Sequence, residues 1–411
     1  YWWVNPPSSW GDPYIQETDG EKRRGEVQVN FPVSLLREQN LTCGLELRET
    51  KSESEKNELS NWEDKNSKTG FLLEHTKWKT NTLGLFLQDE IEIIDPLTLF
   101  VGVRFDRWKS SEGYNYIVKS GATSTYSYPE RDETCISPRL AIVYKMGEDT
   151  RLRFSVAQSF RGPSSYDMYS AWEYTSSGKL KARISNPELK PEKVISGEAG
   201  IEQLFAGKTS IKLTYFQNRM KDYISKKSFT ADEVTEYNTG NGTSYDSIEQ
   251  YQNIAEAESK GVEIEVRSNL SKNFSAFANC TAMSAMVLKN PSASTLEARR
   301  KVEGKRITKI PEITYNVGLD YFWKGLKAGI IGRYVGKTYS KDDNSDIATG
   351  VFGAYDPYFV VNTKISYTYN IAGFSSELSF TCDNIFDEEY YQYYKSPGRI
   401  WGLHLNIGRK F

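Results

Sequence analysis

Apolar and polar residues alternate strictly over many stretches of this chain. In "LTLFVGVRFD", one face would carry Leu97, Leu99, Val101, Val103 and Phe105, and the other Thr98, Gly102, Arg104 and Asp106. The stretches 150–160 and 259–269 repeat this pattern. A period of two predicts β-strands with two unlike faces. Because the polar faces carry Arg or Glu at successive positions, they must meet water or other charges.

The last stretch, "GRIWGLHLNIGRKF", shows the same alternation and ends on an aromatic residue. Its apolar side would carry Trp401, Leu403, Leu405 and Ile407, with the terminal Phe411 at its end. We expect these side chains to contact lipid and the two aromatic residues to lie near the membrane interfaces.

The whole chain divides into about fifteen such strands. They are predicted at 26–36, 41–50, 81–92, 97–107, 136–145, 150–160, 193–203, 209–219, 259–269, 273–287, 312–322, 327–336, 357–369, 375–385 and 399–411. Short polar turns alternate with long connections at about 50–80, 108–134, 161–192, 219–258, 288–311, 337–356 and 386–398. Tight turns at one end and long loops at the other are typical of an outer-membrane barrel.

We therefore predict an all-β, transmembrane, antiparallel up-and-down β-barrel spanning residues 1–411. Bacterial barrels have an even number of strands, so about fifteen strands predict only part of a barrel. We expect the first strands to precede this sequence. Alternatives are a missed strand near the start, or a soluble β-rich carbohydrate-binding protein.

Composition narrows the possible functions. The 52 basic and 54 acidic residues nearly balance, so a nucleic-acid partner is not expected. No apolar stretch is long enough for a membrane-spanning helix. With only His75 and His404 in the chain, a histidine-based metal site is not expected, and no cofactor is predicted. The four cysteines lie far apart, without metal-binding spacing.

Four fragments, in order, resemble a known family. They are "LGLFLQDEIEIIDPLTLFVGVRFDRW", "SFRGPSSYDMY" with "NPELKPEKVISGEAGIE", "ESKGVEIEV", and "CDNIFDEEYYQYYKSPGRIWGLHLNIGRKF". Together they are similar to the barrel of TonB-dependent outer-membrane receptors over residues 82–411. The resemblance implies a 22-stranded barrel closed by an amino-terminal plug domain, of which this sequence lacks the plug and the first strands.

The resemblance also implies a function. Such receptors sit in the bacterial outer membrane, bind scarce ligands and are energised by the TonB complex, here through an upstream segment that the sequence lacks. A ferric siderophore is the favoured ligand; haem, cobalamin or another nutrient is the alternative. A passive porin-like or structural barrel is the alternative of another class. The sequence shows no catalytic motif, so we do not expect an enzyme.

Two loops supply the candidate ligand-binding residues. The loop after "FRGP" carries Tyr166, Tyr169, Trp172 and Tyr174, which could grip a flat chelate, or instead form an outer aromatic belt or pack the loops together. It has no histidine, which argues against haem. The stretch "EARRKVEGKR" carries Arg299, Arg300 and Arg306, which suit an anionic ligand, outer-leaflet phosphates or plain solvation.

Overall fold

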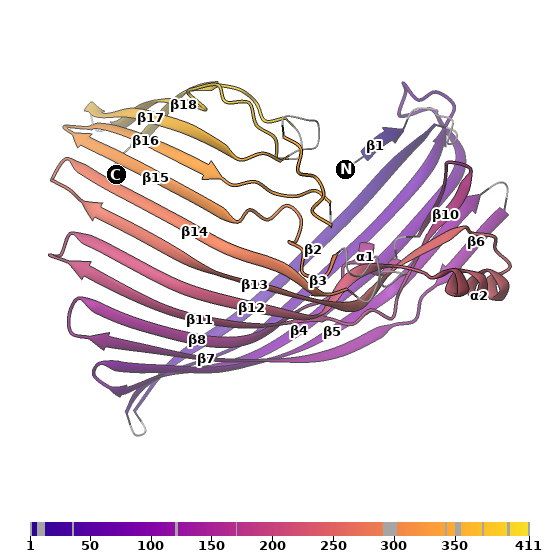
Figure 1. Ribbon diagram of the computed structural model, residues 1–411, viewed down its shortest axis with the longest axis horizontal. Helices are drawn as coiled ribbons and strands as arrows, with labels where there is room; N and C mark the ends of the chain where they lie inside the picture. Colours follow the sequence, from indigo (N-terminus) through magenta and orange to yellow (C-terminus); the bar gives the residue numbers. More distant parts are fainter. Residues whose placement is uncertain are drawn as a thin grey trace.

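The alternating stretches form one large curved sheet. The structure is a computed structural model, and it describes residues 2–5, 13–34, 37–119, 122–169, 171–290, 302–341, 343–349, 355–371, 374–392 and 395–409. In these ranges nineteen strands belong to a single sheet (Figure 1).

Fifteen of the nineteen strands contain ten or more residues, as predicted. They are β2 (Tyr14–Ser34), β3 (Glu38–Leu59), β4 (Lys68–Ile94), β5 (Leu97–Lys119), β7 (Arg131–Met146), β8 (Thr150–Arg161), β11 (Glu192–Phe205), β12 (Thr209–Ser228), β13 (Ser247–Asn269), β14 (Phe274–Lys289), β15 (Ile313–Trp323), β16 (Leu326–Val335), β17 (Tyr358–Ile371), β18 (Phe374–Asp383) and β19 (Ile400–Arg409).

The remaining elements are short and belong mostly to the long connections. They are β1 (Trp2–Asn5), β6 (Ala122–Ser127), β9 (Trp172–Ser176), β10 (Lys179–Ile184), α1 (Ser165–Tyr169) and α2 (Ala231–Asn241). No helix within the described ranges is long and apolar enough to cross a membrane.

Each long strand from β2 to β19 pairs antiparallel with the next long strand along the chain. The tight turns gather at one end of the sheet, and α2, β6 and β10 lie at the other (Figure 1). This is the predicted up-and-down order, with short turns and long loops at opposite ends.

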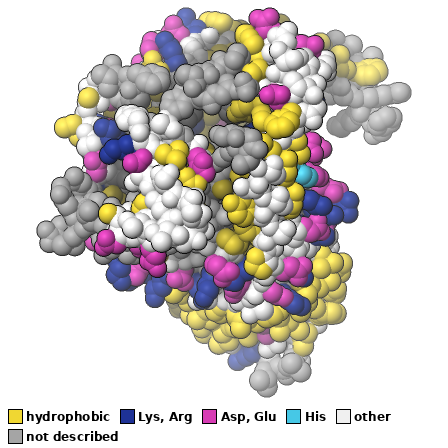
Figure 2. Space-filling model, turned by 90° about the vertical axis from the view of Figure 1, so that its right-hand side faces the viewer, with side chains coloured by type: hydrophobic (Ala, Val, Ile, Leu, Met, Phe, Trp, Pro, Cys, Tyr) yellow, Lys and Arg dark blue, Asp and Glu magenta, His cyan; other side chains and the backbone are white. Residues whose placement is uncertain are grey.

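Register aligns the apolar positions into continuous rows. Val27, Leu45, Leu85, Phe105 and Ile136 pair side by side across β2, β3, β4, β5 and β7, and all five side chains are exposed. We call the face that carries this row the apolar face and the opposite one the polar face. Figure 2 shows hydrophobic side chains covering the lower wall, bordered by acidic and basic ones. A band of this kind suits contact with lipid.

Several strands are longer at the long-loop end than the sequence predicted. The predicted loop 50–80 is mostly strand, because β3 continues to Leu59 and β4 begins at Lys68. Strands β5, β12 and β13 likewise extend into predicted loops. The hydrophobic alternation ends there, but backbone pairing continues, and polar pairs such as Lys79 with Glu49, 2.8 Å apart, replace apolar contacts between the strands.

Helix α2 is held at its start by a capping box. The backbone N–H of Thr230 donates to Glu233 at 2.8 Å, and the Thr230 hydroxyl accepts from the Glu233 N–H. A hydrogen bond from Lys227, together with the backbone bond, lowers the pKa of Glu233. The charged form of Glu233 therefore stabilises the start of α2.

We predict that Thr230→Ala destabilises α2 by about 1 kcal/mol, because one capping bond is lost. Hydrogen exchange in residues 231–241 should speed up about fivefold, while exchange in the long strands stays unchanged. Since the folded pKa of Glu233 is lowered, its contribution is present above the ordinary glutamate range and is lost as the pH falls through the folded pKa. Thr239→Ala on the same helix is the matched control, and equal acceleration there would contradict the capping role.

Candidate ligand-binding loop and charged polar face

The long connection between β8 and β11, residues 162–191, folds over the polar face. Its α1 and the segment after β10 are anchored by a small apolar core that consists of Trp108, Met168, Tyr169, Leu189 and Ile224. Trp108 comes from β5, so this core joins the connection to the sheet. One amide side chain of β13 strengthens the attachment, because Asn253 accepts from the backbone N–H of Lys190 at 2.8 Å and donates to its carbonyl at 2.7 Å.

Tyr169, a predicted ligand contact, belongs to this core. It is 3% exposed, and its hydroxyl is 2.8 Å from the Ser110 hydroxyl. Burial raises the pKa of this phenol. Tyr169 therefore packs in the core beneath the loop, and it does not belong to the proposed ligand-binding surface.

Tyr166 and Trp172 form part of an aromatic box around Arg183. The guanidinium carbon of Arg183 lies 4.2 Å from the ring centre of Trp172, 5.1 Å from that of Tyr251 and 5.9 Å from that of Tyr166. We call these four residues the arginine box. Trp172 and Tyr166 are about half exposed, so the box opens to solvent.

Arg183 itself is 6% exposed and only partly satisfied. Its Nη1 donates to the Tyr166 hydroxyl at 2.9 Å, and its Nη2 lies 3.5 Å from a carboxylate oxygen of Glu249. Its Nε has no hydrogen-bond partner in the described part of the chain. A buried donor without a partner is costly.

Strand pairing assembles the arginine box from distant segments. β10 pairs antiparallel with β9 and parallel with β13, which sets Arg183 opposite Trp172 on one side and Glu249 on the other. Tyr245, just before β13, donates to Glu173 of β9. Burial, with this bond, raises the pKa of Tyr245 and keeps its proton in place.

The other predicted site residues lie away from the arginine box or outside the residues that the structure describes. The backbone of Tyr174 belongs to β9, but its side chain is outside the described residues. Arg299, Arg300 and Phe411 also lie outside them. Arg306 forms an ion pair with Glu312, and its backbone N–H donates to the side-chain oxygen of Asn344 at 2.8 Å. Neither partner belongs to the loop 162–191. On β19, Trp401, Leu403, Leu405 and Ile407 are all exposed.

Arg183, Glu249 and Tyr251 were not among the candidates predicted from the sequence. Arg183 stands in "KLKARIS", where nothing in the local pattern separates it from the neighbouring lysines. Tyr251 and Glu249 lie more than sixty positions away and meet Arg183 only through β10 and β13 pairing. Basic and apolar residues alternate at 179–184 within the long loop, and this alternation could have predicted strand β10.

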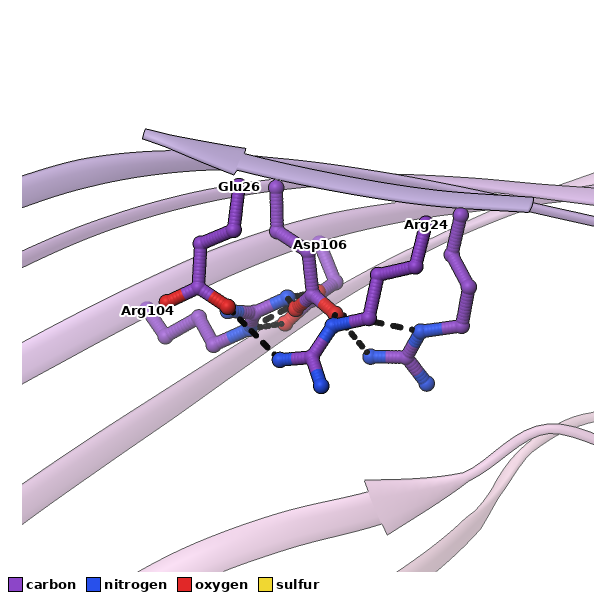
Figure 3. Close-up of polar contacts among 6 residues, drawn as sticks. Arg24, Glu26, Arg104 and Asp106 are labelled. Atoms are coloured by element: carbon purple, nitrogen blue, oxygen red, sulfur yellow. Dashed lines mark hydrogen bonds and ion pairs between the residues drawn. The ribbon is translucent and has the colours of Figure 1, made fainter. Parts of the chain in front are cut away.

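Below the loop, the polar face carries a dense ion-pair network. Glu46 accepts from Arg24, Arg48 and Arg104, at 2.8, 2.9 and 2.7 Å. Arg104 also binds both oxygens of Asp106. Arg24, Glu26, Arg104 and Asp106 converge in one space (Figure 3). Glu46 is 3% and Asp106 2% exposed, so these carboxylates are buried only because the arginines neutralise them.

A glycine makes the network possible. Gly84 of β4 lies between Glu46 of β3 and Asp106 of β5 in the register. A Cβ added at Gly84 would collide with the Arg104 guanidinium. Because Gly84 has no side chain, the Arg104 side chain can pass over β4 and reach Glu46.

A polar cavity of about 470 Å³ adjoins this network. Its lining includes Arg48, Arg104, Arg161, Trp108 and Ser159. Trp108 also belongs to the core under loop 162–191. The floor of the loop and the charged polar face are therefore continuous.

Comparisons with known proteins agree with this architecture. Residues 4–385 match the family described as TonB dependent receptor-like, beta-barrel. The ferric enterobactin receptor of Pseudomonas aeruginosa is 25% identical over 390 residues, covering 91% of this chain and 46% of that protein. The heme/hemopexin utilization protein C of Haemophilus influenzae is 23% identical over 343 residues, covering 80% and 42%.

A solved structure shows the same fold. The ferric yersiniabactin uptake receptor FyuA of Yersinia pestis aligns with a TM-score of 0.68 and 16% identity, over 98% of this chain and 56% of that one. The chain spans about half the length of the curated relatives it matches. The predicted β-barrel fold and outer-membrane location are confirmed, and the relatives are transport receptors rather than enzymes. This chain belongs to the TonB-dependent receptors, and residues 4–385 match their barrel domain.

Proposed function

We propose that the protein is the barrel part of a receptor that captures an anionic ferric chelate at its long-loop end and imports it with energy from the TonB complex. The observation that carries this proposal is the arginine box. A buried guanidinium with an unpartnered Nε, flanked by two half-exposed aromatic rings, combines charge, hydrogen bonding and flat apolar surface. Catecholate or carboxylate oxygens would meet the guanidinium, and the ligand's rings would stack on Trp172.

The polar face extends this proposal toward transport. Arg48, Arg104 and Arg161 border the cavity next to the loop floor, so an anion released from the box would next meet these guanidinium groups. Glu46, Asp106 and Glu192 pair with them, which would prevent the anion from being held too tightly. Haem suits the loop less well, because residues 162–191 contain no histidine to bind its iron.

Ligand binding and uptake together test the proposal. We expect the purified protein to bind a ferric tris-catecholate with quenching of tryptophan fluorescence, and haemin or cobalamin at least tenfold more weakly. Cells that produce the whole receptor should accumulate radioactive iron from that chelate only while the membrane is energised. Uptake that persists after an uncoupler is added would support a passive channel instead.

A further inference from the structure

The strand register brings three potential metal-ligating side chains together on the apolar face. They lie beyond its exposed apolar rows, which we call the lipid-contact band, toward the long-loop end. Glu53 and Glu55 of β3 alternate on the same face as Leu45 and Leu47, farther toward the long-loop end. His75 of β4 pairs directly with Glu55. The cluster lies on the outside of the sheet, away from the arginine box and the polar face.

The three side chains already converge. The His75 Nε2 lies 2.6 Å from Oε1 of Glu53, and one ligand atom of each residue lies within 4.8 Å of the other two. Tetrahedral metal ligation needs such atoms about 3.3 Å apart, which follows from bonds of about 2 Å. Small side-chain rotations would therefore bring the three ligand atoms to distances that suit one metal ion. The ring of Tyr114 packs edge-on against His75 at 5.5 Å and helps to orient the imidazole.

Negative charge accumulates around this cluster. Glu17 and Asp19 of β2 lie directly opposite Glu55 and Glu53, while Lys77 of β4, which pairs with Glu112, lies opposite Glu53 on the other side. Like charges in directly opposed positions destabilise a sheet unless they are neutralised. Glu17 pairs with Lys68, but within the described ranges neither Asp19 nor Glu55 forms an ion pair with a basic side chain. A bound cation would relieve this repulsion.

We propose that Glu53, Glu55 and His75 form a binding site for a divalent transition-metal ion. The carboxylates would supply oxygen ligands and the imidazole a nitrogen, a set that favours Zn²⁺, Cu²⁺ or Ni²⁺ over Ca²⁺ and Mg²⁺. The metal would take the place of the hydrogen bond between His75 and Glu53, and it would cross-link β3 to β4 beyond the lipid-contact band. This departs from the expectation of no metal site, because the three residues converge only in the folded sheet.

Copper spectroscopy tests the site directly, since the chain contains only His75 and His404. Untagged protein, purified in detergent and stripped with a chelator, is titrated with Cu²⁺ and examined by electron paramagnetic resonance. We expect a one-to-one site with nitrogen hyperfine coupling from a single imidazole. The coupling should disappear in His75→Gln and persist in the matched control His404→Gln.

Carboxylate variants and competition complete the test. The double substitution Glu53→Gln with Glu55→Gln should weaken Cu²⁺ and Zn²⁺ binding at least tenfold, whereas Glu21→Gln on the neighbouring strand should not. Millimolar Ca²⁺ should fail to displace Cu²⁺. The proposal is overturned by absent copper binding, by nitrogen coupling that survives His75→Gln, or by equal competition from Ca²⁺. Chelate binding at the arginine box should be unaffected, so the two proposals stand or fall separately.

Discussion

Arg183→Gln should lower the affinity for a ferric tris-catecholate about a hundredfold. The substitution removes a buried positive charge and the fork of donors, and truncating one partner of a buried, charged hydrogen bond costs about 2–5 kcal/mol of binding free energy. Tyr166, Trp172 and Tyr251 would keep their rings, so residual stacking should remain. Fluorescence titration of the purified protein measures the loss.

Two further variants separate the role of Arg183 from general charge and from folding. Lys179→Gln removes one positive charge from an exposed position of the same strand, β10, and should change the affinity less than twofold. Arg183→Lys keeps the charge but loses the planar fork, so an intermediate loss is expected. If Lys179→Gln and Arg183→Gln weaken binding equally, the arginine box does not recognise the ligand. Unchanged hydrogen exchange in 165–184 would show that the loop keeps its fold.

Glu46→Gln should destabilise the sheet by about 3 kcal/mol, since removing one partner of a buried ion pair leaves charges without compensation. Arg24, Arg48 and Arg104 all donate to this carboxylate. The expected loss lies at the low end of the usual range, because Arg24 and Arg48 remain more than half exposed. Denaturant unfolding in detergent, followed by tryptophan fluorescence, measures it.

Glu26→Gln is the matched control within the same network. Among the described residues, Glu26 forms an ion pair with Arg24 alone, at 2.6 Å, and it is far more exposed, so its loss should cost less than about 1 kcal/mol. Gly84→Ala should reproduce much of the Glu46→Gln effect without changing any charge, because its Cβ displaces the Arg104 guanidinium. If Gly84→Ala were neutral, the crossing of β4 by Arg104 would not matter to stability.

The fold was largely predictable from local pattern. Alternation at positions such as Leu97 to Phe105 depends only on the two-residue period of a strand, so all fifteen long strands were found. Several strands were predicted too short at the long-loop end, because residues such as Lys51 and Lys79 look like loop in sequence and become strand by pairing across the ladder.

The site was predictable only in part. The aromatic loop could be located because Tyr166 and Trp172 lie close together in sequence. The separate roles of its residues could not be predicted, because Tyr169 is buried in the core that includes Trp108, whereas Tyr166 is half exposed to solvent. Whether Arg299 and Arg300 act with them stays a prediction.

The strands, their two faces, the alternation of tight turns with long loops, and the family all follow from short-range periodicity and local motifs in the sequence. The meetings of charged groups follow from the folded sheet: Arg183 with Tyr251, Arg104 with Glu46 across Gly84, and His75 with Glu53 and Glu55. Each of these contacts depends on the register between strands, which joins residues distant in sequence and is not encoded in any single segment.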